Sequence, residues 1–179
     1  MGRHVSKVVS ERFGKTILEL GGNNCIIVDE TADMELVVPA IVFGAVGTAG
    51  QRCTSTRRVL VKDSIYEDLK NNLINAYKQV NIGDPLEKGT LMGPLVNESA
   101  VSDFSKAIDR AVKLGGEVVY GGTAIDGAGN FVTPTIIKAQ NDWDIVQEET
   151  FAPILYLIRY SDLDDAIRMH NDVPQGLSS

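Results

Sequence analysis

The sequence has very few of the residues that build disulfide frameworks and metal sites. It contains two cysteines, Cys25 and Cys53, and two histidines, His4 and His170. Two cysteines are too few for a disulfide framework, which indicates a reducing compartment, and we expect the cytoplasm. Neither histidine has other ligands around it at the spacing of a zinc site, so we expect no metal.

Long apolar runs and blocks of like charge are also missing. The longest apolar run, residues 36–46, is too short to span a bilayer, and no apolar signal region follows the first residues. The 17 basic and 24 acidic residues give a net charge of −7 with no block of one sign. We therefore expect neither nucleic acid nor a membrane surface as a partner.

What the chain does have is the composition of a globular protein. Of its 179 residues, 44% are apolar and 23% are charged, which allows one domain of ordinary size with a sizeable core. Apolar spacing predicts helices over residues 1–14, 33–46, 64–80, 98–114 and 162–171. Strand patterns occupy residues 15–20, 23–29, 58–61, 118–120, 131–137 and 154–158. Strands separated by helices predict an α/β fold with a largely parallel sheet flanked by helices.

Five side chains carry more specific expectations. Asp33 and Ser64 are predicted N-caps of the helices that they open. Pro39 marks either the start of the regular helix or a kink in its second turn. That helix has apolar residues all round, which predicts burial on all sides. Phe13 and Val112 are expected on the inward faces of their helices.

The stretch Gly47-Thr48-Ala49-Gly50-Gln51-Arg52-Cys53-Thr54 is the first candidate site. The long apolar helix runs into it, and two glycines then break the pattern just before a thiol. Arg52 adjoins the thiol, and Arg57 and Arg58 follow. A cysteine after a glycine turn, beside fixed positive charge, is a favourable place for a thiolate. Cys53 is therefore a candidate nucleophile, and the alternative is a small buried core residue, the commoner fate of a free cysteine.

Two carboxylates form the other candidate sites. Glu19 precedes the glycine bend Gly21-Gly22 at the end of a predicted strand. Glu149 is followed by Phe151 and a proline turn, a pattern that can hold a ribose hydroxyl and a flat ring. Taken alone, Glu19 would be a surface residue on a strand edge, and Phe151 would plug the core from an ordinary loop.

Together these motifs resemble the NAD(P)-dependent aldehyde dehydrogenase superfamily. The resemblance rests on Glu-Leu-Gly-Gly at residues 19–22, Gly-Gln-Arg-Cys at 50–53 and Glu-Thr-Phe-Ala-Pro at 149–153. Cys53 follows Glu19 by 34 residues, which is the spacing of the family pattern. Smaller matches extend the resemblance over essentially the whole chain: Gly93-Pro94, Gly121-Gly122, Pro134-Thr135 and Gly176-Leu177-Ser178.

Within the superfamily the sequence is most similar to the antiquitin branch, the α-aminoadipic semialdehyde dehydrogenases of lysine degradation. The motifs at residues 19–24, 45–54 and 150–156 carry this similarity. Arg52 and Ala152 stand where many other relatives have a second cysteine and a glycine.

The resemblance implies an aldehyde dehydrogenase catalytic domain and a thiol mechanism. The Cys53 thiolate would attack the aldehyde to give a thiohemiacetal, and hydride would pass to NAD or NADP. Water activated by Glu19, a partly buried general base, would then hydrolyse the thioester. The backbone N–H of Cys53 would help to bind the oxyanion. A Glu at position 19 also favours water over coenzyme A as the acyl acceptor.

The resemblance also assigns residues to the ligands. Glu149 would hold the nicotinamide ribose and Phe151 would pack near the nicotinamide ring, with Leu20 and Gly21 as further cofactor-binding residues. Arg52 is our candidate for binding the carboxylate of an acidic semialdehyde, because a guanidinium recognises a carboxylate bidentately.

The chain covers roughly a third of a typical family member. We expect residues 1–22 to be the tail of the cofactor-binding domain and residues 23–179 to be most of the catalytic domain, truncated at both ends. The phosphate-binding loop would then be missing, so this piece alone should bind NAD weakly or not at all. The complete enzyme is expected to be a homo-oligomer that acts on a small aldehyde.

Three other interpretations stay open. The chain can be an inactive truncated fragment that serves only as a structural or interaction module, alone or with full-length subunits. It can also be a plain structural α/β domain. A cysteine hydrolase of the thiol-protease type needs a histidine to activate the thiol, and neither His4 nor His170 has a supporting context.

Overall fold

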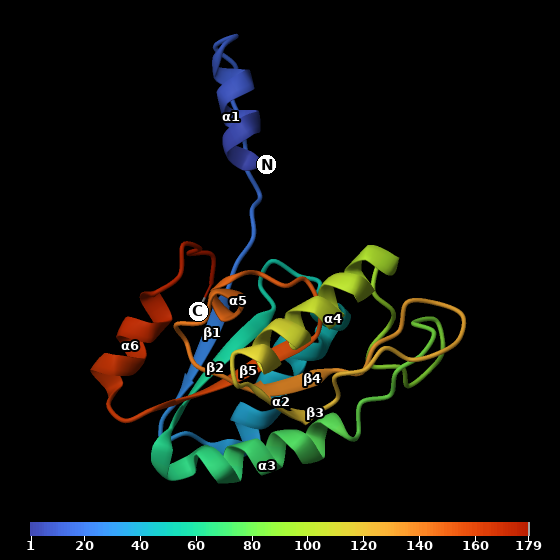
Figure 1. The fold of residues 1–179 in the computed structure, drawn as a ribbon, viewed down its shortest axis with the longest axis vertical. Helices are drawn as coiled ribbons and strands as arrows, with labels where there is room; N and C mark the ends of the chain where they lie inside the picture. Colours follow the sequence, from blue (N-terminus) through green and yellow to red (C-terminus); the bar gives the residue numbers. More distant parts are fainter. Residues whose placement is uncertain (179) are drawn as a thin grey trace.

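A five-stranded sheet lies at the centre of the protein in its computed structural model, which describes residues 1–178 (Figure 1). The strands are β1 (Asn24–Val28), β2 (Thr56–Lys62), β3 (Glu117–Tyr120), β4 (Thr135–Lys138) and β5 (Ile154–Tyr160). Their order is β1-β2-β5-β4-β3, and every neighbouring pair is parallel except β3 and β4. The predicted α/β fold with a largely parallel sheet is confirmed.

Helices cover both faces of this sheet (Figure 1). On one face, α2 (Met34–Val46) packs against α3 (Tyr66–Tyr77), and on the other lie α4 (Glu98–Lys113) and α6 (Leu163–Asn171). The short helix α5 (Asp144–Gln147) precedes β5, and 3-10 turns occupy Gly47–Gly50 and Asp63–Ile65. The first helix, α1 (Gly2–Ser10), stands apart from the sheet, and an extended segment joins it to β1.

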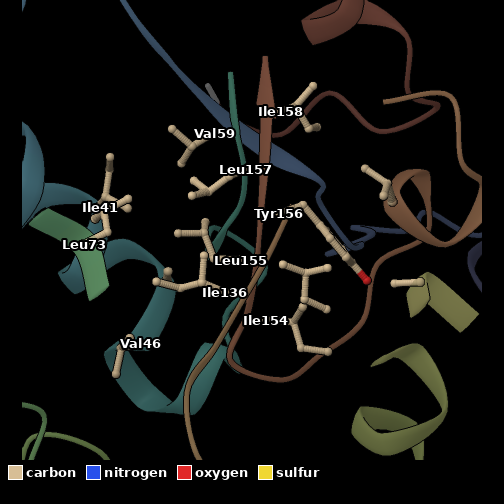
Figure 2. Packing of buried hydrophobic residues seen from close by; sticks show 14 of the residues in the cluster. Ile41, Val46, Val59, Leu73, Ile136, Ile154, Leu155, Tyr156, Leu157 and Ile158 are labelled. Atoms are coloured by element: carbon tan, nitrogen blue, oxygen red, sulfur yellow. The ribbon is translucent and has the colours of Figure 1, made fainter. Parts of the chain in front are cut away.

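The core fills both sides of the sheet (Figure 2). Leu155 and Leu157 of β5 point to the side of α2 and α3, and Ile154, Tyr156 and Ile158 point to the opposite side. All five side chains are buried. Because a central parallel strand is covered on both faces, it has a continuous apolar sequence rather than an alternating one. For this reason the apolar runs within β2 and β5 predict strands.

The predicted helix caps are half right. The Asp33 carboxylate accepts a hydrogen bond from the Glu35 N–H at 2.9 Å and caps α2, and Pro39 lies inside α2 rather than at its start. The prediction for Ser64 is wrong: a 3-10 turn comes first and α3 begins at Tyr66. The Ser64 hydroxyl instead donates to the Glu30 carboxylate.

The predicted burial of α2 on all sides is also wrong. Ile41 is buried against the sheet, but Leu36 is 71% exposed and Phe43 is 70% exposed. The sheet and α3 cover one side of α2, and on the other the Arg52 guanidinium lies over the ring of Phe43. Phe13, at 98% exposed, and Val112 likewise do not face inward.

The expected strand over residues 15–20 does not form. All six residues are exposed, and within residues 1–178 they have no strand to pair with. The predicted strand at 131–137 is shorter in the sheet, because Pro134 lacks an N–H and β4 begins at Thr135. The sequence does not predict helix α5, because a single turn is too short to show a period. None of the helices within residues 1–178 is long and apolar enough to cross a bilayer.

A buried cation, Arg58 of β2, holds the sheet to the segments around α6. Its guanidinium donates to Asn141 Oδ1 at 2.7 Å, to the Asn23 carbonyl at 3.1 Å and to the last carbonyls of α6, those of Met169 and His170, at 2.9 and 3.1 Å. Burial lowers the pKa of Arg58. A buried charge is costly unless hydrogen bonds compensate it, and these four acceptors bind the two terminal nitrogens of the Arg58 side chain.

We predict that Arg58→Met lowers the free energy of unfolding by about 3 kcal/mol, because it leaves several buried acceptors without a donor. Urea unfolding of the two proteins measures the difference. The control is Arg168→Met, which removes an exposed arginine paired with Asp165 on α6 and should cost less than about 1 kcal/mol. Equal losses in the two variants would contradict the importance given to Arg58.

Candidate active site

The candidate nucleophile lies at the end of a strained turn. After α2, the residues Thr48, Ala49 and Gly50 have φ values of 55°, 53° and 68°, in the left-handed region. This region costs free energy for residues with a side chain, and such strain concentrates at functional sites. A Cβ on Gly50 would lie 2.3 Å from the carbonyl oxygen of Ala152. The turn therefore packs directly on the segment that follows Glu149, and Cys53 comes next.

The two thiols differ in their surroundings. Cys25 is buried in β1, and burial raises its pKa to about 11. Cys53 is half-buried and free. The interpretation as a small core residue thus fits Cys25, while Cys53 has the access that a nucleophile needs.

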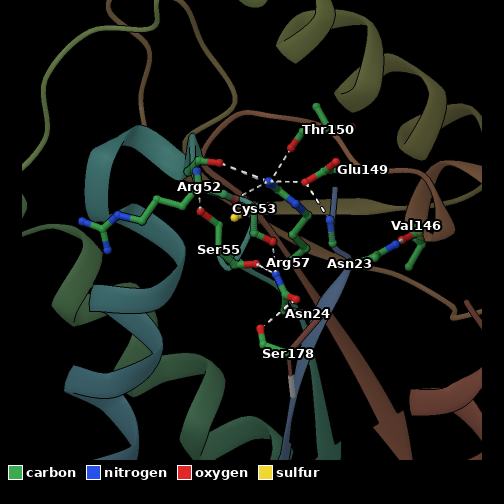
Figure 3. Close-up of polar contacts among 12 residues, drawn as sticks. Asn23, Asn24, Arg52, Cys53, Ser55, Arg57, Val146, Glu149, Thr150 and Ser178 are labelled. Carbon is green, nitrogen blue, oxygen red and sulfur yellow. Dashed lines mark hydrogen bonds and ion pairs between the residues drawn. The ribbon is translucent and has the colours of Figure 1, made fainter. Parts of the chain in front are cut away.

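The start of β1 holds the backbone of Cys53 (Figure 3). The Asn24 side-chain amide donates to the carbonyl oxygens of Cys53 and Ser55, both at 2.8 Å, and its Oδ1 accepts from the Ser178 hydroxyl at 2.8 Å. Gly22 lies so close that a Cβ there would be 2.4 Å from the Cys53 carbonyl oxygen. The glycine bend therefore brings the residues after Glu19 against the nucleophile turn.

Arg57 connects this turn to the second candidate loop (Figure 3). Its guanidinium donates to the Thr150 carbonyl at 2.6 Å, the Arg52 carbonyl at 3.2 Å and the Gly50 carbonyl at 3.3 Å, and lies 3.4 Å from Glu149 Oε1. Its side chain is only 3% exposed. Burial lowers the pKa of Arg57, and the Glu149 carboxylate opposes this shift.

Glu149 and Phe151 lie beside the glycine bend. Glu149 Oε1 accepts from the Gly22 N–H at 3.1 Å, and a Cβ on Gly21 would lie 1.8 Å from Oε2. Phe151 is 46% exposed, with the Arg57 guanidinium 5.3 Å from the ring centre. Phe151 does not plug the core, and the two glycines leave room for the carboxylate. Three motifs that are far apart in the sequence thus meet at one place.

The remaining predicted site residues lie at the margin of this cluster. Glu19 is exposed rather than partly buried, on the extended segment before the bend. Leu20 is half exposed beside Gly2. The Arg52 side chain points away from Arg57 in Figure 3 and donates from Nε to the Thr48 hydroxyl at 2.8 Å. Its guanidinium lies 5.2 Å from the ring centre of Phe43.

Sequence reasoning did not identify Arg57 and Asn24 as organisers of the site. From the sequence, Arg57 is only a positive charge close to Cys53 in the chain. Arg57 lies one residue before the predicted strand 58–61, and the structure extends that strand to Thr56 and buries it; a buried arginine must find several acceptors. Asn24 belongs to the motif at residues 19–24, but its role was not predictable, since its partners are backbone carbonyls 29 and 31 residues away.

The fold and this cluster define an α/β domain with an accessible thiol on a glycine turn, next to a carboxylate and an exposed aromatic ring. The model of the aldehyde dehydrogenase family matches residues 1–179, and the chain belongs to this family.

Individual relatives agree with this assignment. The chain is 51% identical to a putative aldehyde dehydrogenase family 7 member A1 homolog of Dictyostelium discoideum and 49% identical to the α-aminoadipic semialdehyde dehydrogenase of Mus musculus. The alignments cover 100% of this chain but 35% and 33% of those proteins. The chain thus spans about a third of the length of the curated relatives it matches.

Solved structures show the same architecture. The lactaldehyde dehydrogenase of Escherichia coli superposes with a TM-score of 0.95 at 37% identity, over 99% of this chain and 38% of that one. The betaine aldehyde dehydrogenase of Staphylococcus aureus, solved in complex with NAD+, gives 0.94 at 31% identity, over 98% and 36%.

The packing at Gly22 yields a direct prediction. Gly22→Ala should lower the free energy of unfolding by about 2 kcal/mol, because the new methyl would overlap the Cys53 carbonyl and force the turn to move. Gly83→Ala is the control, since its nearest neighbour would be 3.6 Å away, and it should change stability by less than about 1 kcal/mol. Urea unfolding compares the two, and a neutral Gly22→Ala would show that the bend does not constrain the turn.

Proposed function

We propose that the complete protein oxidises an aldehyde to the carboxylic acid with NAD or NADP. The observation that carries this proposal is the meeting of the half-buried Cys53 with Glu149 and Phe151 in a member of the aldehyde dehydrogenase family. The proposal concerns the whole protein, because the chain spans only a third of its relatives.

The residues present suit a nicotinamide cofactor. The Glu149 side chain is 20% exposed and can accept a hydrogen bond from a ribose hydroxyl, and the exposed ring of Phe151 offers a flat surface for the nicotinamide. Gly21 has no side chain and so leaves room for the Glu149 carboxylate itself, and Leu20 precedes it in the chain. When bound, the dinucleotide supplies the hydride acceptor.

Cys53 carries the covalent chemistry in this proposal. Its thiolate adds to the aldehyde carbon to give a thiohemiacetal, and its own N–H donates to the oxyanion. After oxidation the acyl group is a thioester on Cys53, which water attacks readily. The backbone contacts from Asn24 and Arg57 fix the turn on which the thiol sits.

Glu19 is the proposed general base for that hydrolysis. Its support is the place of Glu19 at the head of the glycine bend that packs against Cys53, together with the spacing of the two residues in the family pattern. A carboxylate at this position takes a proton from water as water attacks the thioester.

Residues 1–22 are proposed to end the cofactor-binding domain, and residues 23–179 to form most of the catalytic domain. The separate position of α1 and the exposure of Val5 and Val8 on it support this division, since apolar side chains of a helix are usually covered in the complete protein (Figure 1). We also propose that the complete protein is a homo-oligomer and is located in the cytoplasm, a reducing compartment.

An acidic semialdehyde, such as α-aminoadipic semialdehyde, is the proposed substrate. The mouse and bovine relatives carry that name. Arg52, partly exposed and adjacent to Cys53 in the chain, is the proposed partner of the substrate carboxylate. Its guanidinium lies on the side of Phe43 and Thr48, so the carboxylate would enter from there.

The decisive experiment measures NADH formation by the complete protein with α-aminoadipic semialdehyde. Cys53→Ala should abolish NADH formation, while Cys25→Ala, the control for loss of a thiol, should retain it. Glu19→Gln should release about one NADH per site and then turn over about 100-fold more slowly, because acyl hydrolysis lacks its base. Full activity in Cys53→Ala would refute the mechanism, and no activity in a folded complete protein would favour the alternative of a structural module.

A second prediction concerns the substrate. Arg52→Ala should lower kcat/KM for the acidic semialdehyde about 30-fold through loss of a charged hydrogen-bond partner. A neutral aldehyde of the same length should change less than about threefold. Arg110→Ala, an exposed arginine paired with Glu148, is the control. An unchanged ratio between the two aldehydes would remove Arg52 from substrate binding.

A further inference from the structure

One buried side chain, that of Arg57, contacts both loops of the candidate site. We propose that Arg57 is a positioning residue that fixes both the path of the nucleophile turn and the orientation of Glu149. A change at Glu149 should then alter the reactivity of Cys53. The inference rests on the proposed function, because it assigns Cys53 and Glu149 to one reaction.

The shape of the Arg57 guanidinium allows it to bind the nucleophile turn and the Glu149 loop at the same time. Nη1 donates to the Thr150 and Gly50 carbonyls, and Nη2 donates to the Gly50 and Arg52 carbonyls and pairs with Glu149. These acceptors belong to two segments that are far apart in the sequence. A planar fork can hold them in fixed relative positions, whereas a lysine ammonium is a single point charge.

The charge adds a second connection. The Arg57 side chain is 3% exposed, so solvent screens its field only weakly. Burial lowers the pKa of Arg57, whereas the Glu149 carboxylate and the Cys53 thiolate both oppose that shift. The same guanidinium thus pairs with the Glu149 carboxylate and donates to the Arg52 carbonyl, one residue before Cys53.

The contacts on Glu149 show why its orientation depends on Arg57. The same atom, Oε1, accepts from the Gly22 N–H and pairs with Arg57. The Arg57 guanidinium also lies 5.3 Å from the ring centre of Phe151, on the same loop as Glu149. Removing the guanidinium would leave the carboxylate with one backbone donor and release the Thr150 carbonyl.

The test uses the complete protein and follows alkylation of Cys53 by iodoacetamide, with peptide mass spectrometry to separate it from Cys25. Arg57→Met should slow alkylation about tenfold, and Arg57→Lys, which keeps the charge, should slow it about threefold. The matched control is Arg110→Lys, which alters the pair between Arg110 of α4 and Glu148, the neighbour of Glu149, without touching the nucleophile turn; its rate should stay within about twofold.

A double-mutant cycle tests the link itself. Glu149→Gln should speed alkylation about threefold when Arg57 is present, because it uncovers the positive charge, and should have less than half that effect in Arg57→Met. If Arg57→Met does not fold, the same cycle is run with Arg57→Gln, which also removes the charge. A folded Arg57→Met with the normal alkylation rate, or equal effects of Glu149→Gln in both backgrounds, would overturn the inference. Turnover by Cys53→Ala would instead overturn the proposed function, because alkylation does not depend on turnover.

Discussion

The buried guanidinium of Arg57 is the contact on which the candidate site depends. It joins the turn before Cys53 to the loop of Glu149 through three backbone carbonyls and one carboxylate. Neither segment is an α-helix or a strand at the points of contact, so no regular backbone ladder joins them. The Arg57 guanidinium, with several donors, makes the connection instead. The contacts around it also hold the strained turn at Thr48 and Ala49 in place.

Two neighbouring arginines of β2 hold different parts of the domain in contact. Arg57 contacts both loops of the candidate site, and Arg58, on the opposite face of the strand, binds the end of α6 and the residue before β1. Alternation along the strand sends the two side chains to different sides of the sheet. Since Arg58 fixes Asn23 and Asn24 binds the Cys53 carbonyl, stability and the geometry of the site share one stretch of chain.

The sequence was most informative where the signal was local. Continuous apolar strands, the Asp33 cap and the glycine turn before Cys53 all have causes within a few residues, and each appears in the structure as predicted. It was least informative where the outcome depends on distant partners. The segment 15–20 alternates like a strand, but none of the strands within residues 1–178 pairs with it. Which side of α2 is buried depends on where the sheet and α3 pack against it. The role of Arg57 depends on carbonyls that only the folded chain brings together.

The most direct test of the account is to find where the substrate carbon becomes attached. The complete protein is mixed with NAD and α-aminoadipic semialdehyde, quenched in acid within the first turnover and digested for peptide mass spectrometry. The account predicts the acyl mass on the peptide that contains Cys53 and none on the peptide that contains Cys25. Acyl on Cys25, or NADH formation with no acyl on either cysteine, would contradict the assignment of Cys53 as the nucleophile.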